Sequence, residues 1–336
     1  MTPTTPIFVA GHGGMVGSAI VRRLTERGYA RVLVRTRSEL DLCDPASTDA
    51  WFDRERPEIV FLTAARVGGI RANLEHPAEM IDTNLRIALS VIGAAHRYGV
   101  RRLIYFGSGC AYPRDCAQPM REEHILTGPV EPTSAPYAIA KIAGMRLCQA
   151  YNAQYGTEYV SLIPSTLYGP NDNFDPDSAH VLSALLSRFH EAAVNGVDRL
   201  VVWGSGMPLR ELLYVDDLAD ACLLLANLPS DVLREQLEPS GFMVNVGSGE
   251  EVSIAKLACA VRGVVGTDGE LVFDRSKPDG TPRKFLDSSR MRGLGWAPQV
   301  TLSDGLRRTY QWYLENGPAL RRLVQVNGND GRTRLD

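Results

Sequence analysis

Several features are missing from this sequence, and each absence excludes a class of protein. The six cysteines contain no C-x-x-C pair and the six histidines form no H-E-x-x-H motif, so we expect no metal site. No apolar run reaches bilayer length, and no basic segment followed by an apolar core stands at the N-terminus. A net charge of -3 argues against a nucleic-acid partner. We therefore expect a cytoplasmic protein with reduced thiols and no nucleic-acid or membrane partner.

The chain begins with a predicted strand, a glycine-rich turn and a predicted helix. Residues 6–10 are a short apolar run typical of a buried strand, and a helical pattern covers about residues 16–27. Glycines at this joint let the backbone turn tightly and approach a pyrophosphate, which the free amides at the helix start attract. The G-x-x-G-x-x-G spacing indicates a dinucleotide site; a glycine turn without a ligand is the alternative. The candidate cofactor residues are Gly11, His12, Gly13, Gly14, Met15, Val16 and Gly17.

The end of the second predicted strand, residues 31–35, indicates which dinucleotide binds. Many NAD enzymes place a carboxylate there for the adenosine ribose, whereas this chain has Arg35 and Arg37 and no acid at that point. Two guanidinium groups favour the 2′-phosphate of NADP. For either arginine alone, a solvated loop position is the alternative. We expect Asp41 and Leu42 to lie at the adenine edge.

A tyrosine and a lysine four residues apart form a candidate proton-transfer pair. Tyr137 and Lys141, in PYAIAK, lie on one face of a predicted helix. The ammonium favours the phenolate, so we expect it to lower the pKa of the phenol from about 10 toward working pH. Ser108, which follows a predicted buried strand, would donate a second hydrogen bond to the same substrate oxygen. Such a pair also occurs by chance on exposed helices, but the glycine turn favours the catalytic interpretation.

Strand and helix patterns alternate along the first half of the chain, for example a helical pattern near residues 44–55 followed by an apolar strand pattern at residues 59–62. Alternation predicts an α/β fold, a Rossmann-like doubly wound parallel sheet with a smaller mixed α/β substrate-binding domain. Ligands of such sheets bind beyond the carboxyl ends of the strands. We expect an NADP-binding domain from residues 1–167 and about 214–250, a substrate-binding domain from about 168–213 and 251–326, and a disordered tail at 327–336.

Motifs over nearly the whole chain resemble those of the extended short-chain dehydrogenases/reductases. Within that family they resemble a branch that epimerises and reduces a GDP-4-keto-6-deoxy sugar. Ser108, Tyr137 and Lys141 are widespread in the family, whereas Cys110, two residues after the serine, and His180, beyond a polar loop, resemble this branch in particular. The matching runs are AGHGGMVGSAI, RTRSELDL, AARVGGI, GSGCAYP, EPTSAPYAIAKIAG, GPNDNF, VVWGSGMPLRELLYVDD and SKPDGTPRK.

The resemblance implies an NADPH-dependent conversion of GDP-4-keto-6-deoxy-D-mannose to GDP-L-fucose. Inverting C3 and C5 passes through enolates of the C4 carbonyl and needs a base on one face and an acid on the other. Cys110 and His180 are expected to be that pair, with Ser108 and Tyr137 stabilising the enolate oxygen before hydride reaches C4. A buried filler role for Cys110 and an inert loop position for His180 are the alternatives. Other functions left open are a GDP-colitose or GDP-deoxyheptose type of epimerase/reductase, or a non-catalytic NADP-binding sensor or scaffold.

The resemblance also implies further binding residues. The substrate-binding candidates are Arg188, Trp203, Arg210 and Asp279, since arginines neutralise a diphosphate and an indole offers an apolar surface. A core position for Trp203 and a turn-forming role for Asp279 are the alternatives. The remaining cofactor candidates are Phe106, Gly107, Ser108, Gly109, Lys141, Pro164, Ser165, Thr166, Leu167 and His180.

The sequence departs from the family pattern at two positions. Gly13 stands where related sequences often have arginine, which leaves NAD use open beside NADP. Asn171 stands where they usually have histidine, close to the expected substrate, which leaves the sugar open. The resemblance further implies a homodimer formed through a four-helix bundle of the helices near residues 77–98 and 137–155.

Overall fold

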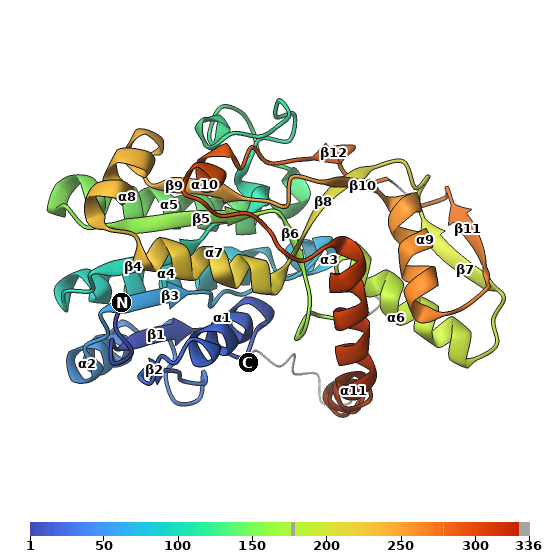
Figure 1. Ribbon diagram of the computed structural model, residues 1–336, viewed down its shortest axis with the longest axis horizontal. Coiled ribbons are helices and arrows are strands. Elements are labelled where there is room, and N and C mark those ends of the chain that lie inside the picture. The colour runs from blue at the N-terminus through green and yellow to red at the C-terminus, as the bar shows by residue number, and fades with distance from the viewer. Residues whose placement is uncertain (176–178, 278, 329–336) are drawn as a thin grey trace.

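A parallel sheet of six strands forms the centre of the computed structural model, which describes residues 1–175, 179–277 and 279–328 (Figure 1). The strand order is β2-β1-β3-β4-β5-β9, and every neighbouring pair is parallel. The predicted doubly wound α/β fold is therefore confirmed. The strands are β1 (Ile7–Ala10), β2 (Val32–Leu33), β3 (Ile59–Leu62), β4 (Arg102–Phe106), β5 (Tyr159–Pro164) and β9 (Met243–Val246).

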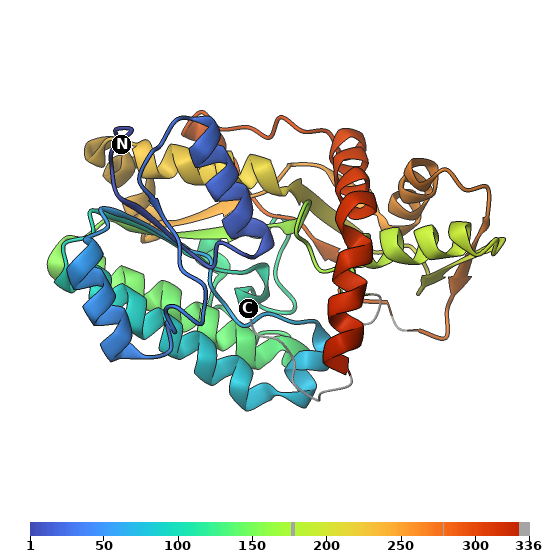
Figure 2. The same cartoon turned by 90° about the horizontal axis from the view of Figure 1, so that it is seen from below.

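Helices cover both faces of this sheet, and each face has its own apolar core. Alternate residues of β1 point to opposite faces, so Phe8 packs into one core while Ile7 and Val9 pack into the other. One face carries α2 (Pro45–Glu55), α4 (Pro77–Arg97) and α5 (Ala135–Tyr155), and the other carries α1 (Met15–Glu26), α7 (Val215–Asn227), α8 (Ser230–Leu237) and α10 (Ser289–Gly293). In Figure 2, α4 and α5 run side by side along the first face.

The second half of the chain builds a smaller region with a third core. Its strand β8 (Leu209–Tyr214) pairs with β10 (Glu251–Ser253), β12 (Arg283–Lys284) and β6 (Thr166–Tyr168), while β7 (Arg199–Trp203) pairs with β11 (Glu270–Asp274). Its helices are α6 (Val181–Val194), α9 (Ile254–Val265) and α11 (Leu302–Gly328). In Figures 1 and 2, α11 lies between the six-stranded sheet and this smaller region. The short helix α3 (Ile70–Glu75) precedes α4.

Three details differ from the sequence-based expectations. The second strand is only two residues long and forms the edge of the sheet, not a strand over residues 31–35. Met291 and Trp296, in the range expected for the smaller domain, pack in the core of the large sheet with α1 and α7. The helix α11 extends through Gly328, so it includes the first two residues of the tail expected at 327–336, and residues 329–336 lie outside the described part.

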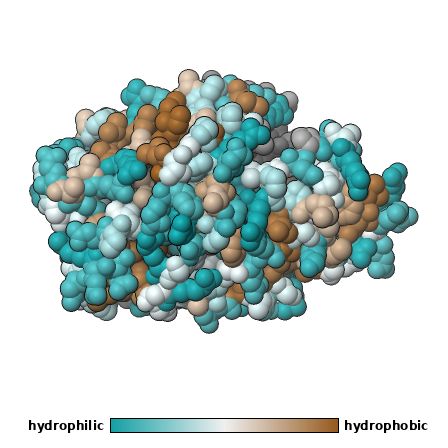
Figure 3. Space-filling model, turned by 90° about the horizontal axis from the view of Figure 1, so that it is seen from above, coloured by the Kyte–Doolittle hydropathy of each residue, from teal (hydrophilic) through white to brown (hydrophobic). Residues whose placement is uncertain are grey.

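The surface seen in Figure 3 is mostly hydrophilic, with apolar residues in separate patches. Within the described ranges, every helix is too short or too polar to traverse a lipid bilayer.

Candidate active site

The turn after β1 can be built only with glycine at two positions. Gly11 has a φ of 87°, and a Cβ added there would lie 2.6 Å from the backbone nitrogen of Ala64. A Cβ on Gly17 would lie 2.1 Å from the carbonyl oxygen of Gly11, so the first turn of α1 packs directly against the loop. These contacts keep the N-terminus of α1 at the carboxyl end of β1, where its free amide groups face outward.

Two unsatisfied polar atoms show that this edge of the sheet fits a polar ligand. Nδ1 of His12, in the glycine turn, and the hydroxyl of Ser165, just after β5, are buried without a hydrogen-bond partner among the described residues. Buried polar groups of this kind ordinarily have partners. Together with the glycine cradle and the helix N-terminus, they fit a bound dinucleotide with its pyrophosphate at α1.

The two arginines expected at the adenosine ribose are partly engaged with the protein. Arg35 donates to the carbonyl of Val34 (2.6 Å) and forms an ion pair with Glu55 (3.3 Å). Arg37 lies 3.9 Å from the Asp41 carboxylate and is exposed. Arg37 is thus the more available of the two for a 2′-phosphate.

The structure also places an acid at this turn that the sequence interpretation missed. Glu39 folds back so that its carboxylate accepts hydrogen bonds from the backbone N–H (2.7 Å) and hydroxyl (2.8 Å) of Thr36. These bonds lower the pKa of Glu39, helped by the charges of Arg35 and His12. An acid six residues beyond the end of β2 gives no recognisable signal in the sequence, because only the turn brings its carboxylate back toward the strand.

Ser108, Tyr137 and Lys141 meet beyond the carboxyl end of β4. The Ser108 hydroxyl accepts from the backbone N–H of Cys110 (3.2 Å) and is hydrogen-bonded to the phenol of Tyr137. Both Tyr137 and Lys141 lie on α5, one helical turn apart, as the spacing predicted. The ammonium of Lys141 is buried and donates to the carbonyl of Phe106 (2.9 Å), the last residue of β4.

The pKa of Tyr137 differs from the expectation. We predicted that Lys141 would lower it, but burial raises the pKa of Tyr137, and the nearby Cys110 raises it further, while only the hydrogen bond to Ser108 opposes them. The lysine Nζ lies 5.8 Å from the centre of the Tyr137 ring, and burial lowers its own pKa to about 8. In this form of the protein, desolvation therefore outweighs the lysine charge at the phenol.

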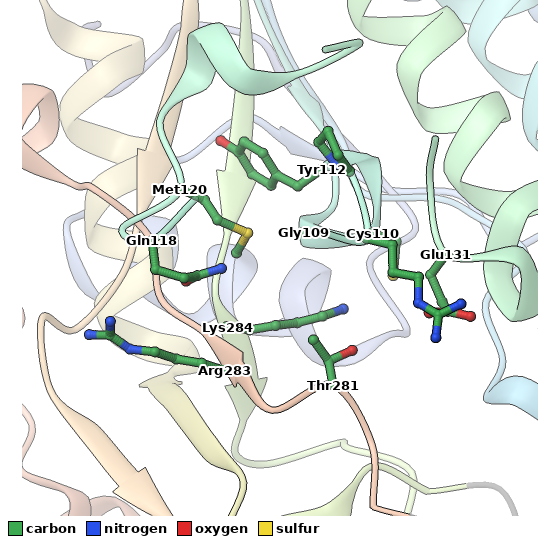
Figure 4. A pocket seen from close by; sticks show the side chains of 11 residues that line it. Gly109, Cys110, Tyr112, Gln118, Met120, Glu131, Thr281, Arg283 and Lys284 are labelled. Carbon is green, nitrogen blue, oxygen red and sulfur yellow. The ribbon is translucent and has the colours of Figure 1, made fainter. Parts of the chain in front are cut away.

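Cys110 lines a small pocket next to this group (Figure 4). Cys110 is a free cysteine that is partly exposed and not part of the buried core. In Figure 4 the side chain of Lys284, from β12, crosses the pocket beside Thr281 with its ammonium on the side where Cys110 lies. Tyr112 and Met120 close the opposite wall, so the thiol faces a cavity with both polar and apolar walls.

His180 lies apart from these residues in the described contacts. It is the residue immediately before α6, and its side chain is exposed. Among the described residues no hydrogen bond joins it to Ser108, Cys110 or Tyr137. Its charge instead interacts with the buried carboxyl group of Asp172.

The four substrate-binding candidates lie in the smaller region in two pairs. The Arg188 guanidinium stacks on the Trp203 ring at 4.2 Å from the ring centre, and half of Trp203 is exposed, so it is not a core residue. Asp279 accepts hydrogen bonds from the N–H (2.8 Å) and hydroxyl (2.6 Å) of Ser205, which lower its pKa. Arg210 donates to backbone carbonyl groups, and burial lowers its pKa while the Asp279 charge opposes that effect.

Asn171 also has a place that the sequence did not indicate. Its backbone adopts a positive φ of 63°, which asparagine tolerates better than most residues. Its side-chain amide donates to the hydroxyl of Ser18 on α1 (2.8 Å). The residue expected near the sugar therefore connects the loop before α6 with the cofactor-binding helix.

A dinucleotide cradle beside a Ser–Tyr–Lys group and an accessible thiol defines the class: a dinucleotide-dependent enzyme that acts on a carbonyl compound. The model of the NAD dependent epimerase/dehydratase family matches residues 7–247. The chain belongs to this family.

Similar proteins include enzymes of nucleotide-sugar metabolism. The chain is 53% identical to the putative GDP-L-fucose synthase 2 of Arabidopsis thaliana, over 92% of each sequence. It is 50% identical to the GDP-L-fucose synthase of Escherichia coli (strain K12), over 92% of this chain and 97% of that one. Among solved structures, a GDP-mannoheptose C4 reductase from Campylobacter jejuni with NADP bound superposes with a TM-score of 0.83 at 35% identity, covering 94% of this chain and 99% of that one.

Proposed function

We propose that this enzyme converts GDP-4-keto-6-deoxy-D-mannose to GDP-L-fucose by inverting C3 and C5 and then reducing C4 with NADPH. The observation that carries the proposal is the thiol of Cys110 facing a pocket beside the hydrogen-bonded pair of Ser108 and Tyr137. A reductase needs only the oxygen-binding pair, whereas an epimerase also needs a base near the carbons next to the carbonyl. The similarity to GDP-L-fucose synthases over 92% of the chain supports the same substrate.

Inversion follows from the acidity of the hydrogens next to the C4 carbonyl. Cys110 as thiolate and His180 as imidazolium form the base and acid pair, and loss of the proton leaves an enolate whose charge lies on O4. Ser108 and Tyr137 donate hydrogen bonds to that oxygen as the charge develops. The raised pKa of Tyr137 suits a hydrogen-bond donor, because the phenol stays protonated until it transfers its proton to O4 during reduction.

Reduction uses the same oxygen site. The bound cofactor would be held by the glycine turn, by Ser165 and by Lys141, and it supplies the hydride for C4. Tyr137 transfers its proton to O4, and the Lys141 ammonium, one turn along α5, stabilises the phenolate that remains. For the nucleotide, Arg188 with Trp203 and Arg210 with Asp279 supply the charges and the flat surface that a GDP group requires.

The test is a direct conversion. The purified protein is incubated with GDP-4-keto-6-deoxy-D-mannose and NADPH, then with NADH, and the product is identified by NMR. We expect GDP-L-fucose, with NADPH preferred because Arg37 is available and Glu39 is engaged with Thr36. In D₂O, Cys110→Ser should suppress deuterium entry at C3 and C5 while folding and NADPH affinity stay at the level of the parent. Equal exchange in variant and parent would remove the base assignment.

A related sugar is the second candidate. The Campylobacter jejuni relative is a GDP-mannoheptose C4 reductase, and a GDP-L-colitose synthase from Yersinia pseudotuberculosis is 31% identical over 92% of the chain. Asn171 stands where related sequences usually have histidine, and its side chain bonds to Ser18. This difference near the expected sugar is the reason to test these other substrates. Incubating the protein with the corresponding 4-keto sugars in parallel decides between these substrates. A protein that binds NADPH but oxidises it with none of these sugars would be a sensor or scaffold.

We further propose that two chains associate through α4 and α5 and that the enzyme works in the cytoplasm. The two helices pack against each other, and Leu89 of α4 and Ile139 of α5 are large apolar side chains exposed to solvent. A second pair of helices packed on this face would form a four-helix bundle.

A further inference from the structure

Glu39 is a charged side chain at the cofactor end of the sheet that takes no part in the proposed chemistry. It lies in the turn after β2, where its carboxylate accepts hydrogen bonds from the backbone N–H (2.7 Å) and the hydroxyl (2.8 Å) of Thr36. The N–H groups of Glu39 (3.1 Å) and Leu40 (2.9 Å) donate to the carbonyl oxygen of Thr36 and close the turn. Residues 36–39 are exposed, so a ligand can reach these groups.

The groups of this turn are those that a phosphate monoester also binds. The Thr36 hydroxyl is hydrogen-bonded to the hydroxyl of Ser38 (3.0 Å) as well as to Glu39. The guanidinium of Arg37 is 3.9 Å from the Asp41 carboxylate, which is too far for a hydrogen bond. A backbone N–H, two hydroxyls and a guanidinium are common ligands of phosphate in proteins. The turn therefore forms an anion site, and a carboxylate of the protein itself occupies it.

The position of the turn relative to the cofactor indicates which anion would bind there. Strand β2 pairs with β1, so the turn after β2 and the glycine turn after β1 lie at the same edge of the sheet. In dinucleotide-binding folds the loop after the second strand meets the adenosine ribose. A Cβ added at Gly13, in the glycine turn, would meet nothing within 4 Å, so the space beside that residue is open. The 2′-phosphate of NADP is the anion that would arrive at this turn.

We infer that the Glu39 carboxylate occupies the position of the cofactor's 2′-phosphate and that NADPH displaces it, whereas NADH leaves it bonded to Thr36. This inference rests on the proposed use of NADPH. Both groups are anions that accept from the same donors, and like charges at such short range repel, so they cannot share the turn. The free energy gained by binding the phosphate is reduced by the cost of releasing Glu39. Glu39 thereby sets how strongly the enzyme prefers NADPH over NADH.

Two nucleotides that differ only in the 2′-phosphate test this site: adenosine 2′,5′-bisphosphate and adenosine 5′-monophosphate. Isothermal titration calorimetry of the cofactor-free protein near neutral pH gives their dissociation constants, together with those of NADPH and NADH. Glu39→Gln keeps the size of the side chain and a carbonyl acceptor but removes the charge. We expect the bisphosphate and NADPH to bind about 10-fold more tightly, because a neutral acceptor is released from Thr36 at lower cost. The affinities for the monophosphate and NADH should stay within about twofold of the parent.

A double-mutant cycle distinguishes competition from support of the turn, since a threonine followed three residues later by glutamate is also a capping pattern. Thr36→Val removes one donor from both anions, so the affinity of the parent for the bisphosphate should change by no more than about twofold. In a Glu39→Ala background no carboxylate competes, and the same change should weaken bisphosphate binding about 5- to 10-fold.

Asp274→Asn is the matched control. The Asp274 carboxylate, on β11 in the smaller region, likewise accepts from the backbone N–H (3.0 Å) and hydroxyl (2.6 Å) of one residue, Ser276. Its replacement should leave the affinities for all four ligands unchanged.

The outcomes separate this inference from the proposed function. Bisphosphate binding by Glu39→Gln that is unchanged or weaker, or an equal gain for the monophosphate, overturns the displacement of Glu39. An equal loss on Thr36→Val with and without the Glu39 carboxylate also overturns it. A parent protein that binds NADPH no more tightly than NADH overturns the proposed use of NADPH instead.

Discussion

Replacing Lys141 with methionine should abolish turnover and at the same time stabilise the cofactor-free protein. Only 3% of the Lys141 surface is exposed, and the contacts that offset its charge are a hydrogen bond to the carbonyl of Phe106 (2.9 Å) and the ring of Tyr105 at 5.0 Å. Methionine retains most of the volume and the apolar stem without the charge. Lys141 is therefore needed for the chemistry although its buried charge destabilises the folded protein.

The size of the effect follows from the pKa of the ammonium group. Burial lowers the pKa of Lys141 from 10.5 to about 8, and a shift of this size corresponds to about 3 kcal/mol of unfavourable burial when the group is charged. Removing the hydrogen bond to Phe106 costs about 1 kcal/mol. We expect the free energy of unfolding of Lys141→Met to exceed that of the parent by about 2 kcal/mol near pH 7.

The stability difference between Lys141→Met and the parent should also change with pH, in a direction set by the lowered pKa of Lys141. Between about pH 8 and pH 10.5 the unfolded chain holds the proton and the folded chain does not, so the stability of the parent rises through this window. The difference between Lys141→Met and the parent should therefore be largest near neutral pH and shrink toward pH 10.

Urea unfolding of the cofactor-free proteins, followed by fluorescence at a series of pH values, measures this difference. Lys256→Met is the control, because Lys256 is exposed on α9 and its replacement should alter stability little at any pH. A parent more stable than Lys141→Met at pH 7, or a difference that does not vary with pH, would refute the reasoning.

Three further predictions concern chemistry, packing and assembly. Tyr137→Phe should lower NADPH oxidation about 100-fold or more while deuterium exchange at C3 and C5 falls less, and comparable losses in both assays would contradict the division of labour. Gly17→Ala should lower the free energy of unfolding in urea by about 1–3 kcal/mol and weaken NADPH binding, because the added Cβ would lie 2.1 Å from the Gly11 oxygen. The control Gly263→Ala, which has open space around the added Cβ, should not lower the free energy of unfolding. Leu89→Glu, at a position 59% exposed on α4, should shift the protein to monomers in size-exclusion chromatography with light scattering, and an unchanged mass would exclude this face.

Local signals in the sequence predicted most of the large sheet. The strand predicted at residues 59–62 is β3, because four consecutive apolar residues fit a strand buried on both faces. The helix predicted near residues 44–55 begins at Pro45, where the Asp44 side chain accepts from the N–H of Ala46 (3.1 Å). The second strand was predicted too long. Only Val32 and Leu33 pair with β1 at the edge of the sheet, and the local sequence does not indicate how many residues will pair.

Residue types and their spacing determined the chemistry that this chain can attempt: a glycine turn for a dinucleotide, a tyrosine and lysine one turn apart, and a serine and cysteine two apart. Each of those features is local, and helix periodicity places Tyr137 and Lys141 on one face of their helix. The parallel sheet brings the separate features to one edge. Tertiary structure decided their environment. Burial raises the pKa of Tyr137 and lowers that of Lys141, because desolvation depends on segments far apart in the chain.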